Sequence, residues 1–439
     1  MKRILFVFSV LIVFGVVGHF LFANSVEKKI DSHIKELNSS GFIANCDKKI
    51  GFLNVVGNGE IEIIYPKKAL EYLISKRSDG EFKEYLKESL LSLDEKELEL
   101  LLDGVLIEYE FTYKNFLNKL NFDMFLVRAS NAALSEALKD EELAHLLDFL
   151  KNKEVKISFD EDLNFKLKDI NYIFKEGSLQ LRGVHGDVNG FKVGLFKVSE
   201  VANQVHFLVD NIDFKYEESD ENINSFLKID NIKFDEFYTK VKVENLLINS
   251  NSIISNGVLD GESKISSDKM FFFQNGESIG FDESEFYISL KKVPYDELKK
   301  YSALLNSEGF LESEDFIVKT KEILSKISSS NLSFLAKTNL NNFKKNDEKY
   351  FENLNLNADF ELAQNLQNLN FIYLKDIFKT VKLNGSLKSS YLTNLLENLP
   401  NEIAFLFKDL RFENFDILLD EKGLHLNQEL LLDYTFLTL

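Results

Sequence analysis

The chain has 439 residues, of which 45% are apolar, so it is long enough for a sizeable core and too apolar for a disordered chain. It carries 71 Asp and Glu against 52 Lys and Arg, which gives a net charge of −19. Because nucleic-acid affinity depends chiefly on contacts with phosphates, a surface this acidic argues against a nucleic-acid partner. Cys46 is the only cysteine, so no disulfide can form within the chain.

Residues 4–23 follow Lys2 and Arg3 and contain only two polar side chains. Twenty helical residues span about 30 Å, the hydrocarbon thickness of a bilayer. The two cations predict that the N-terminus stays in the cytoplasm. We therefore expect one transmembrane helix within residues 1–24, which anchors the chain and exports residues 25–439. A cleaved secretion signal is the alternative, and it exports the same residues.

The next segment, residues 25–152, is predicted to be a mixed segment with a helical insertion. A polar helix is expected over residues 27–37, and a strand pair over residues 51–65 with its turn at Asn58 and Gly59. Pro66 suits the first turn of a helix, where its missing N–H costs nothing. The other elements expected here are helices over residues 69–75, 82–93, 95–102 and 131–151, and a strand over residues 105–111.

A repeated pattern predicts an antiparallel β meander over residues 153–291. Each copy has apolar residues at positions one, three, six and eight and an Asp or Asn at position five. The apolar residues alternate as in a strand, but the spacing changes from even to odd at position five. A β-bulge or a bend between two short strands explains this change, and either predicts a strongly twisted or curled sheet. Position five is occupied by Asp169, Asn211, Asn231, Asn245 and, near the end of the chain, Asp409.

Turn residues agree with the meander. Eight of the 20 glycines follow Asn or Asp, and such pairs are preferred in tight hairpin turns. The copies begin at residues 165, 207, 227, 241 and 405, and this irregular spacing argues against a solenoid. The pairs most expected to form turns lie between alternating segments, and they are Asn189-Gly190, Asn256-Gly257, Asp260-Gly261 and Asn275-Gly276.

The last segment, residues 292–439, is predicted to contain a helical patch that begins at Pro294 and the closing strands of the same body. The expected elements are helices up to residue 304 and over residues 315–327 and 391–399, and strands over residues 332–340, 354–362, 405–419 and 424–436. The predicted fold class is therefore α+β, with a large twisted or curled antiparallel sheet, helical insertions and one preceding transmembrane helix.

An N-terminal anchor followed by many strands with the Asp or Asn pattern resembles the YdgA-like family of bacterial envelope proteins. The ending over residues 417–427 is similar to the closing hairpin of that family. AsmA-like envelope proteins have similar strands after a similar anchor. The resemblance implies a single-pass protein of the bacterial inner membrane with residues 25–439 in the periplasm. The first family implies no reaction, and the second implies lipid handling in the envelope.

A search for catalytic and metal-binding motifs favours a protein that is not an enzyme. His145 follows two glutamates, but the first histidine of a zinc helix is missing. His185 and Asp187 are too few to close a zinc site. The sequence contains no phosphate loop and no dinucleotide fingerprint, and none of its six histidines lies in a nucleophile motif. We expect no catalytic residues, no metal site and no cofactor.

Two functions therefore compete. In the first, Phe207, Val209, Val241 and Val243 line an apolar groove on the curled sheet that binds a lipid or another hydrophobic ligand. In the second, the protein is an envelope assembly or interaction scaffold that holds partner proteins at its sheet edges or helical insertions. A third interpretation assigns every apolar face to the core. The partners expected are the membrane, through the N-terminal helix, with lipid or envelope proteins and without nucleic acid.

Overall fold

The computed structural model divides the chain into two compact units, Met1–Ala202 (unit 1) and Asn203–Leu439 (unit 2). The boundary falls inside the predicted meander of residues 153–291. The structure describes residues 26–51, 53–76, 94–114, 119–137, 141–201, 204–219, 221–305, 318–319, 322–323, 326, 332–362, 378–389, 414–420 and 422–433. The predicted anchor lies outside these residues. Within them, no helix has both the length and the apolar character needed to cross a membrane.

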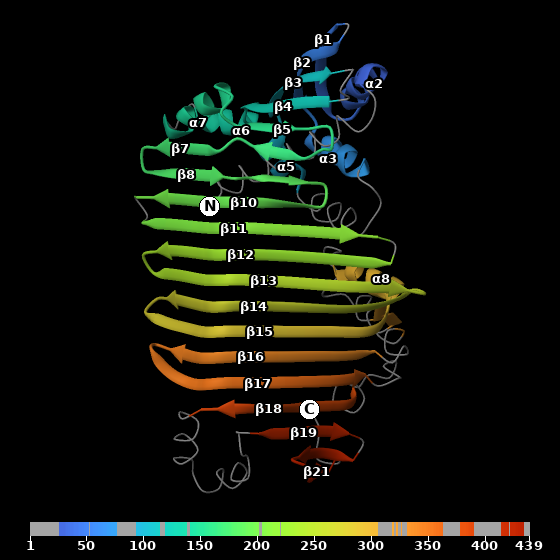
Figure 1. Cartoon of the computed structure of the whole chain (residues 1–439), viewed down its shortest axis with the longest axis vertical. Helices are drawn as coiled ribbons and strands as arrows, with labels where there is room; N and C mark the ends of the chain where they lie inside the picture. The colour runs from blue at the N-terminus through green and yellow to red at the C-terminus, as the bar shows by residue number, and fades with distance from the viewer. Residues whose placement is uncertain are drawn as a thin grey trace. The chain divides into compact units, whose positions relative to one another are not determined.

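Unit 1 contains an antiparallel sheet that follows the chain (Figure 1). Strands β1 to β6 pair in succession. Strands β6 and β7 are two halves of one interrupted strand: β6 pairs with β9, and β7 pairs with β8. Both β8 and β9 pair with β10. The strands are β1 (Phe42–Ile50), β2 (Asn54–Ile63), β3 (Leu106–Lys114), β4 (Lys119–Arg128), β5 (Lys156–Phe159), β6 (Phe165–Leu167), β7 (Ile170–Phe174), β8 (Gly177–Arg182), β9 (His185–Asp187) and β10 (Gly190–Glu200).

Helices contribute to the core of unit 1. Leu37 and Leu98 come from helices and are as fully buried as Phe42, Ile61 and Phe122 from the strands. The helices are α2 (Val26–Ser39), α3 (Pro66–Ser75), α5 (Glu95–Leu102), α6 (Asn131–Ala137) and α7 (Glu141–Lys151). The predicted helices over residues 27–37, 69–75 and 95–102 are confirmed. The predicted helix over residues 131–151 is described as helix at both ends, by α6 and α7.

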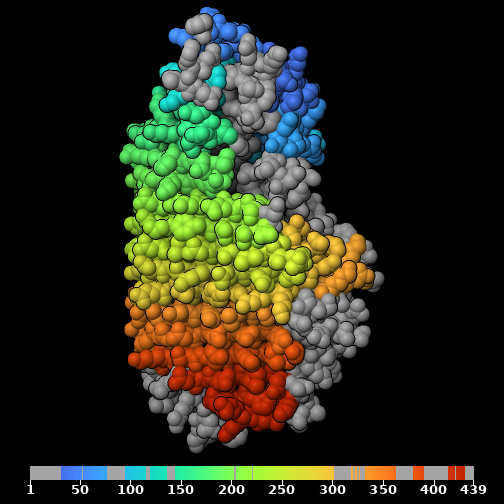
Figure 2. Space-filling view, turned by 45° about the vertical axis from the view of Figure 1, so that its right-hand side comes forward, coloured from blue at the N-terminus to red at the C-terminus, as the bar shows by residue number. Residues whose placement is uncertain are grey.

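Unit 2 is a long antiparallel meander in which each strand pairs with the next (Figure 1), and its strands follow one another as bands in chain order (Figure 2). Strands of 17 residues such as β13 and β14 extend about 55 Å. The strands are β11 (Val205–Glu218), β12 (Asn222–Glu236), β13 (Thr239–Ser255), β14 (Val258–Gln274), β15 (Glu277–Pro294), β16 (Ser333–Lys345), β17 (Glu348–Leu362), β18 (Phe378–Lys388), β19 (Phe415–Asp420), β20 (Gly423–Leu426) and β21 (Glu429–Asp433). The predicted large antiparallel sheet is confirmed.

Helix α8 (Tyr295–Leu305) follows β15 directly, as predicted from Pro294. Its residues Tyr295 and Leu298 pack against a small buried cluster that includes Leu259 and Val293 at the ends of β14 and β15. Figure 2 shows this helix as a protrusion on one side of the banded sheet. The predicted helices over residues 82–93 and 391–399, and the pattern copy at 405–412, lie outside the described residues.

The position-five pattern has a structural cause. Asn211 and Asn245 have φ values of +52° and +51° inside otherwise continuous strands, and the strand pairing passes over both residues. One left-handed residue resets the side-chain alternation, so Val209 and Ile212 lie on the same face of the sheet. In the copy at residue 165 the chain instead breaks between β6 and β7. Both interpretations of the pattern therefore occur, but the prediction for Asn231 is wrong: it pairs with Asp210 and Glu244, and the residue left out on β12 is Asp230.

Residues left out of the strand pairing in unit 2 form a line across the sheet, here called the kink line, and four of them (Asn211, Asn245, Glu283 and Asn342) have a positive φ. On each strand one or two residues are left out of the pairing, and they lie opposite the residues left out on the neighbouring strand. Asn is favoured because its short side chain tolerates a positive φ. The kink line consists of Asn211, Asp230, Asn245, Asp268, Glu283 and Asn342.

Three of the eight glycines that follow Asn or Asp lie inside strands, so the turn predicted from such pairs is wrong there. Gly59 lies inside β2 opposite Cys46, where a Cβ atom would come within 2.1 Å of the Asn45 carbonyl oxygen. Close approach of the backbone, and not a turn, therefore requires glycine there. Gly261 lies in β14 next to a register shift, and Gly385 lies inside β18.

Two predicted turns are confirmed in detail. Asn256-Gly257 and Asn275-Gly276 have positive φ at both residues, as the hairpin turn of two residues requires. The β9–β10 hairpin also reverses at Asn189. The closing strand predicted over residues 424–436 is divided into β20 and β21, because Asn427 and Gln428 form a turn with positive φ at both positions.

Candidate functional site

The sheet of unit 2 has two chemically different faces. On the first, the paired residues of successive strands are mostly aliphatic or aromatic, and we call it the apolar face. One row across the strands runs Phe207, Phe234, Val241, Phe272 and Ile279, and the next runs Val209, Ile232, Val243, Met270 and Phe281. Beyond the kink line the same face continues with Phe214, Leu227, Ile248, Ile265 and Phe286.

The four predicted groove residues are brought together on this apolar face. Phe207 and Val241 both pair with Phe234, and Val209 and Val243 both pair with Ile232. Val209 and Val243 are buried, whereas Phe207 and Val241 are half-buried. That a ligand occupies this place stays a prediction.

The exposed part of the apolar face was missed by the sequence analysis. Phe272 is 42% exposed, Ile279 is 38% exposed and Ile288 is 41% exposed. Phe272 stands between Phe271 and Phe273, so the alternation that separates the two faces is hidden in a run of three phenylalanines. Its pairing with Val241 reveals the face to which it belongs.

The opposite face carries mostly amide, hydroxyl and charged side chains, and we call it the amide face. Two open hollows lie in it, of about 450 Å³ and 530 Å³. The first is lined by residues of β11 to β15, including Lys215, Asn224, Phe226, Asn249 and Tyr287. The second is lined by residues of β15 to β19, including Glu285, Lys337, Asn355, Asn357 and Asn384.

Charged groups on the amide face bind one another. Lys264 forms an ion pair with Glu285 on the next strand, with 2.8 Å between nitrogen and oxygen. The Tyr287 hydroxyl donates to the Glu262 carboxylate at 2.8 Å, and this bond raises the pKa of Tyr287. The Lys337 ammonium lies 5.7 Å from the centre of the Tyr287 ring, within the range of a cation–π contact.

Asparagines in the second hollow and beside it form a hydrogen-bonded array. The Asn355 amide donates to Asn353 at 2.7 Å, and Asn353 donates to Asn341 at 2.6 Å. The Asn357 amide donates to Asn384 at 3.3 Å. The signal for this array is present in the sequence, because Asn353, Asn355 and Asn357 alternate with apolar residues and so share one face.

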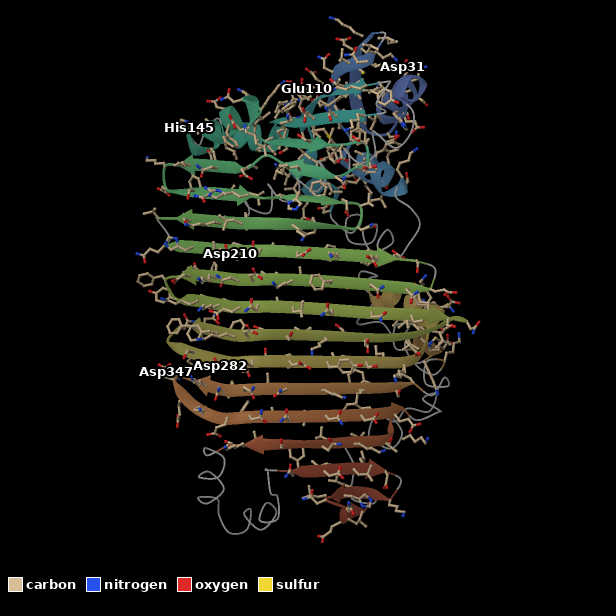
Figure 3. The ribbon with its side chains drawn as sticks, in the orientation of Figure 1. Asp31, Glu110, His145, Asp210, Asp282 and Asp347 are labelled. Carbon is tan, nitrogen blue, oxygen red and sulfur yellow. The ribbon has the colours of Figure 1, made fainter. Side chains whose placement is uncertain are left out.

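The kink line is an electrostatic feature as well as a geometric one. Asn211 donates to Asp230 at 2.9 Å, and Asn245 donates to Asp268 at 2.6 Å. Hydrogen bonds from Lys228 and then Asn211 lower the pKa of Asp230. Figure 3 shows Asp210 and Asp282 beside this line within their strands, and Asp347 at a hairpin end. These bonds satisfy the polar groups of a kinked strand and need no ligand.

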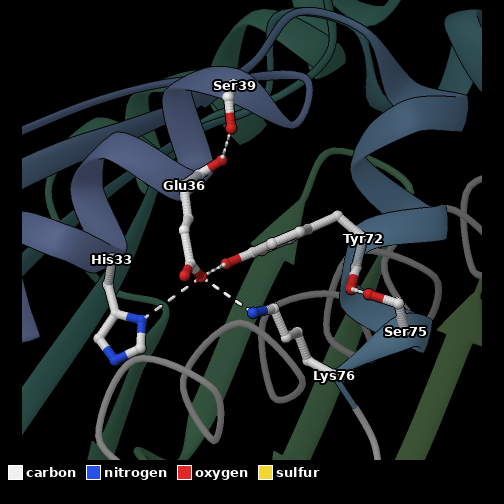
Figure 4. Close-up of polar contacts among 6 residues, drawn as sticks. All are labelled: His33, Glu36, Ser39, Tyr72, Ser75 and Lys76. Carbon is white, nitrogen blue, oxygen red and sulfur yellow. Dashed lines mark hydrogen bonds and ion pairs between the residues drawn. The ribbon is translucent and has the colours of Figure 1, made fainter.

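A polar cluster in unit 1 links two helices (Figure 4). The Glu36 carboxylate of α2 accepts hydrogen bonds from the Tyr72 hydroxyl of α3 and from the ammonium of Lys76, the residue that caps the C-terminus of α3, each at 2.9 Å. His33 lies 3.8 Å from the same carboxylate. The bond from Lys76, followed by that from Tyr72, lowers the pKa of Glu36. The carboxylate is therefore held as an anion by its donors, and the cluster fastens α2 to α3.

Candidate metal ligands are not gathered in the part of the chain that the structure describes, where no group of three or more His, Cys, Asp or Glu side chains is placed to hold an ion. The His185 ring nitrogen lies 3.0 Å from the Gly183 carbonyl oxygen, and Asp187 accepts from the backbone of Asn189 and Gly190 in the turn. Both residues thus serve local structure.

Comparison with known proteins adds no relative: no family model, no curated protein and no solved structure matches this chain.

Proposed function

We propose that this chain is a non-catalytic protein of the bacterial inner membrane that binds a lipid or another hydrophobic ligand on the apolar face of unit 2. In this proposal residues 1–24 form the anchor and residues 25–439 lie in the periplasm, as the resemblance to YdgA-like envelope proteins implies. The apolar stretch of residues 4–23 after Lys2 and Arg3 supports the anchor.

The exposure of Phe272, Ile279 and Ile288 on one continuous apolar face is the observation that carries the proposal. When a ligand covers apolar side chains that contact water, the complex is stabilised by about 0.8 kcal/mol for each methylene group buried. Rows that cross the sheet beside buried Val209 and Val243 give an acyl chain an extended apolar surface.

Adjacent phenylalanines on β14 allow a matched binding test. Phe272 belongs to the apolar face, whereas Phe271 pairs with Lys242 and belongs to the amide face. We expect Phe272→Asp to weaken binding of a fluorescent fatty acid to the full chain by roughly tenfold, because a charge on the apolar face must be desolvated by the ligand. Phe271→Asp, on the other face, is expected to leave the affinity within about twofold.

A photoreactive phenylalanine analogue placed at position 272 or 271 gives the same comparison in cells. Lipid attached at position 272 and absent at 271 supports the proposal. Equal labelling at both positions reports only proximity to the bilayer. An apolar face that takes up no fatty-acid probe and no lipid would rule the proposal out.

A scaffold that holds envelope proteins is the second candidate function, and an exposed hairpin favours it. Phe237 and Tyr238 form the tip between β12 and β13, are 62% and 63% exposed, and lie 4.7 Å apart between ring centres. Exposed aromatic pairs are common anchors of protein interfaces. Crosslinking from position 237 in cells that joins one defined envelope protein, and is lost in Tyr238→Ala, supports this function; lipid adducts alone count against it.

A further inference from the structure

The two hollows of the amide face lie next to each other and together follow one strip across the sheet. The first hollow includes Tyr287 and the second includes Glu285, two residues apart on the same face of β15. The Lys264–Glu285 ion pair and the contact of Lys337 with the Tyr287 ring join the two hollows. The strip crosses nine strands, from β11 to β19, a distance of about 40 Å. Its length suits a polymer better than a single small molecule.

The strip is electrically balanced, although the whole chain has a net charge of −19. Three cationic and three anionic side chains line the two hollows. Because the charges cancel, neither a polyanion nor a polycation gains a net attraction there. The charged residues that line the strip are Lys215, Lys264, Lys337, Glu217, Glu262 and Glu285.

Primary amides give the strip its hydrogen-bonding capacity. Five asparagines line the second hollow, and each amide offers two donors and an acceptor oxygen. The array among them uses only part of this capacity. The Asn357 side-chain oxygen is buried and accepts no hydrogen bond from any of the described residues. The other amide donors and acceptors that line the strip can bind ligand hydroxyl groups.

Aromatic rings lie among these amides. Phe226 and Tyr287 line the first hollow, and Phe415 lines the second. A ring presents an apolar surface on which the C–H groups of a sugar ring can pack, while the neighbouring amides bind its hydroxyl groups. A peptide strand fits less well, because it adds to an unpaired sheet edge, whereas β15 to β18 are paired on both sides.

We propose that this strip is a binding site for a neutral, hydroxyl-rich polymer, that is, a glycan chain. The site lies on the amide face and is independent of the hydrophobic ligand proposed for the apolar face. The amides bind hydroxyl groups, the rings pack against the sugar faces, and the balanced charges give strongly charged chains no net attraction.

The test uses the full chain in detergent micelles and hexamers of N-acetylglucosamine and of glucose as probes. We expect saturable binding of at least one hexamer that stays unchanged when salt rises from roughly 0.05 to 0.5 M, because screening has little effect on neutral partners. The double variant Asn355→Ala/Asn357→Ala should weaken binding by roughly tenfold, since each lost neutral hydrogen bond accounts for a severalfold change.

Two controls separate this site from general effects. Asn222→Ala changes an exposed asparagine of β12 outside the strip and should leave the affinity unchanged. Phe272→Asp changes the apolar face and should weaken fatty-acid binding by roughly tenfold without affecting the hexamers. The proposal is overturned if neither hexamer binds, if the double variant binds as tightly as the wild type, or if only acidic oligosaccharides or anionic lipid vesicles bind.

Discussion

Units 1 and 2 are both antiparallel meanders, yet they bury their side chains very differently. Of the buried apolar residues in the described part of the chain, 33 belong to unit 1 and nine belong to unit 2. In unit 1 helices add their own apolar residues to the core, as Leu37 and Leu98 do. In unit 2 most apolar side chains of the long strands stay half-buried. Strand pairing alone is therefore enough to form the sheet, but helices packed on the sheet determine how many of its apolar side chains are buried.

This difference has a functional meaning. A face sealed by helices contributes stability, whereas a half-buried face keeps surface that a ligand or partner can cover. Unit 1 has the character of a stable domain, and unit 2 presents two chemically distinct surfaces on opposite faces of one sheet. Matched substitutions in the two units test this contrast in burial.

Truncation of one phenylalanine in each unit should show the largest difference. Phe122 is fully buried between Tyr109 and Phe159, with ring centres 5.8 Å and 6.1 Å away. We expect Phe122→Ala to cost about 3–5 kcal/mol of unfolding free energy, because a dense core cannot collapse onto the cavity. Phe234 is half-buried in unit 2, and Phe234→Ala should cost less than half as much.

Hydrogen exchange measured on peptides of each unit gives the loss of unfolding free energy for each variant separately, since two units need not unfold in one step. An equal cost in both units would show that the apolar face of unit 2 is sealed in solution. That result would also remove the main support for a hydrophobic ligand there.

Glycines within strands give a second comparison. A Cβ at Gly59 in unit 1 would meet the Asn45 carbonyl oxygen at 2.1 Å and the Tyr109 hydroxyl at 2.6 Å. A Cβ at Gly280 in unit 2 would meet nothing closer than 3.5 Å. We expect Gly59→Ala to destabilise the protein by about 1–3 kcal/mol through overpacking, and Gly280→Ala to change its stability by less than about 0.5 kcal/mol. Thermal unfolding of the two variants measures these changes in stability. Equal losses of stability would contradict the tighter packing around Gly59 than around Gly280.

The kink line predicts an intermediate effect confined to unit 2. Asn245 has a φ of +51°, which a β-branched residue adopts only with strain. Asn245→Val should therefore cost about 1–2 kcal/mol, whereas Asn245→Gly should cost much less because glycine accepts a positive φ. Chemical denaturation distinguishes the two variants. Similar losses would show that the hydrogen bond from Asn245 to Asp268, and not the backbone conformation, holds the kink.

The alternation of apolar residues was enough to predict the sheet of unit 2 and the kinks at Asn211 and Asn245. It did not reveal the kinks at Glu283 or Asn342, because the pattern around them is degenerate and glutamate has no special preference for a positive φ. The Asn58-Gly59 pair was misassigned as a turn, since the same two residues also serve where a backbone approaches closely.

The candidate sites depend on register, which a single sequence does not supply. Phe207, Val209, Val241 and Val243 could be placed on one face from their alternation alone. The strip of the amide face could not be found in this way, because it unites Lys215 with Asn384 across strands far apart in the chain. These two residues can be placed on one strip only when the register of every strand between them is known.

The smallest effect is expected from the cluster that fastens α2 to α3 in unit 1. Its hydrogen bonds from Lys76 and Tyr72 lower the pKa of Glu36 below the ordinary value of 4.5. A carboxylate with a lowered pKa in the folded state stabilises the protein above its unfolded pKa, and this contribution is lost as the pH falls through the folded value. Glu36→Gln should therefore reduce the stability of unit 1 at pH 7 and have progressively less effect below pH 4.5.

Because the Glu36 side chain is 41% exposed, solvent screens its contacts, and we expect the loss at pH 7 to be no more than about 1 kcal/mol. Glu97→Gln on α5 removes a charge from another exposed position of unit 1 and serves as the matched control. Hydrogen exchange at pH 7 should detect the loss in peptides of α2 and α3 and leave the strands of unit 2 unchanged. If the two variants behave alike across this pH range, the cluster contributes only net charge, and the stability of unit 1 rests on its buried apolar residues.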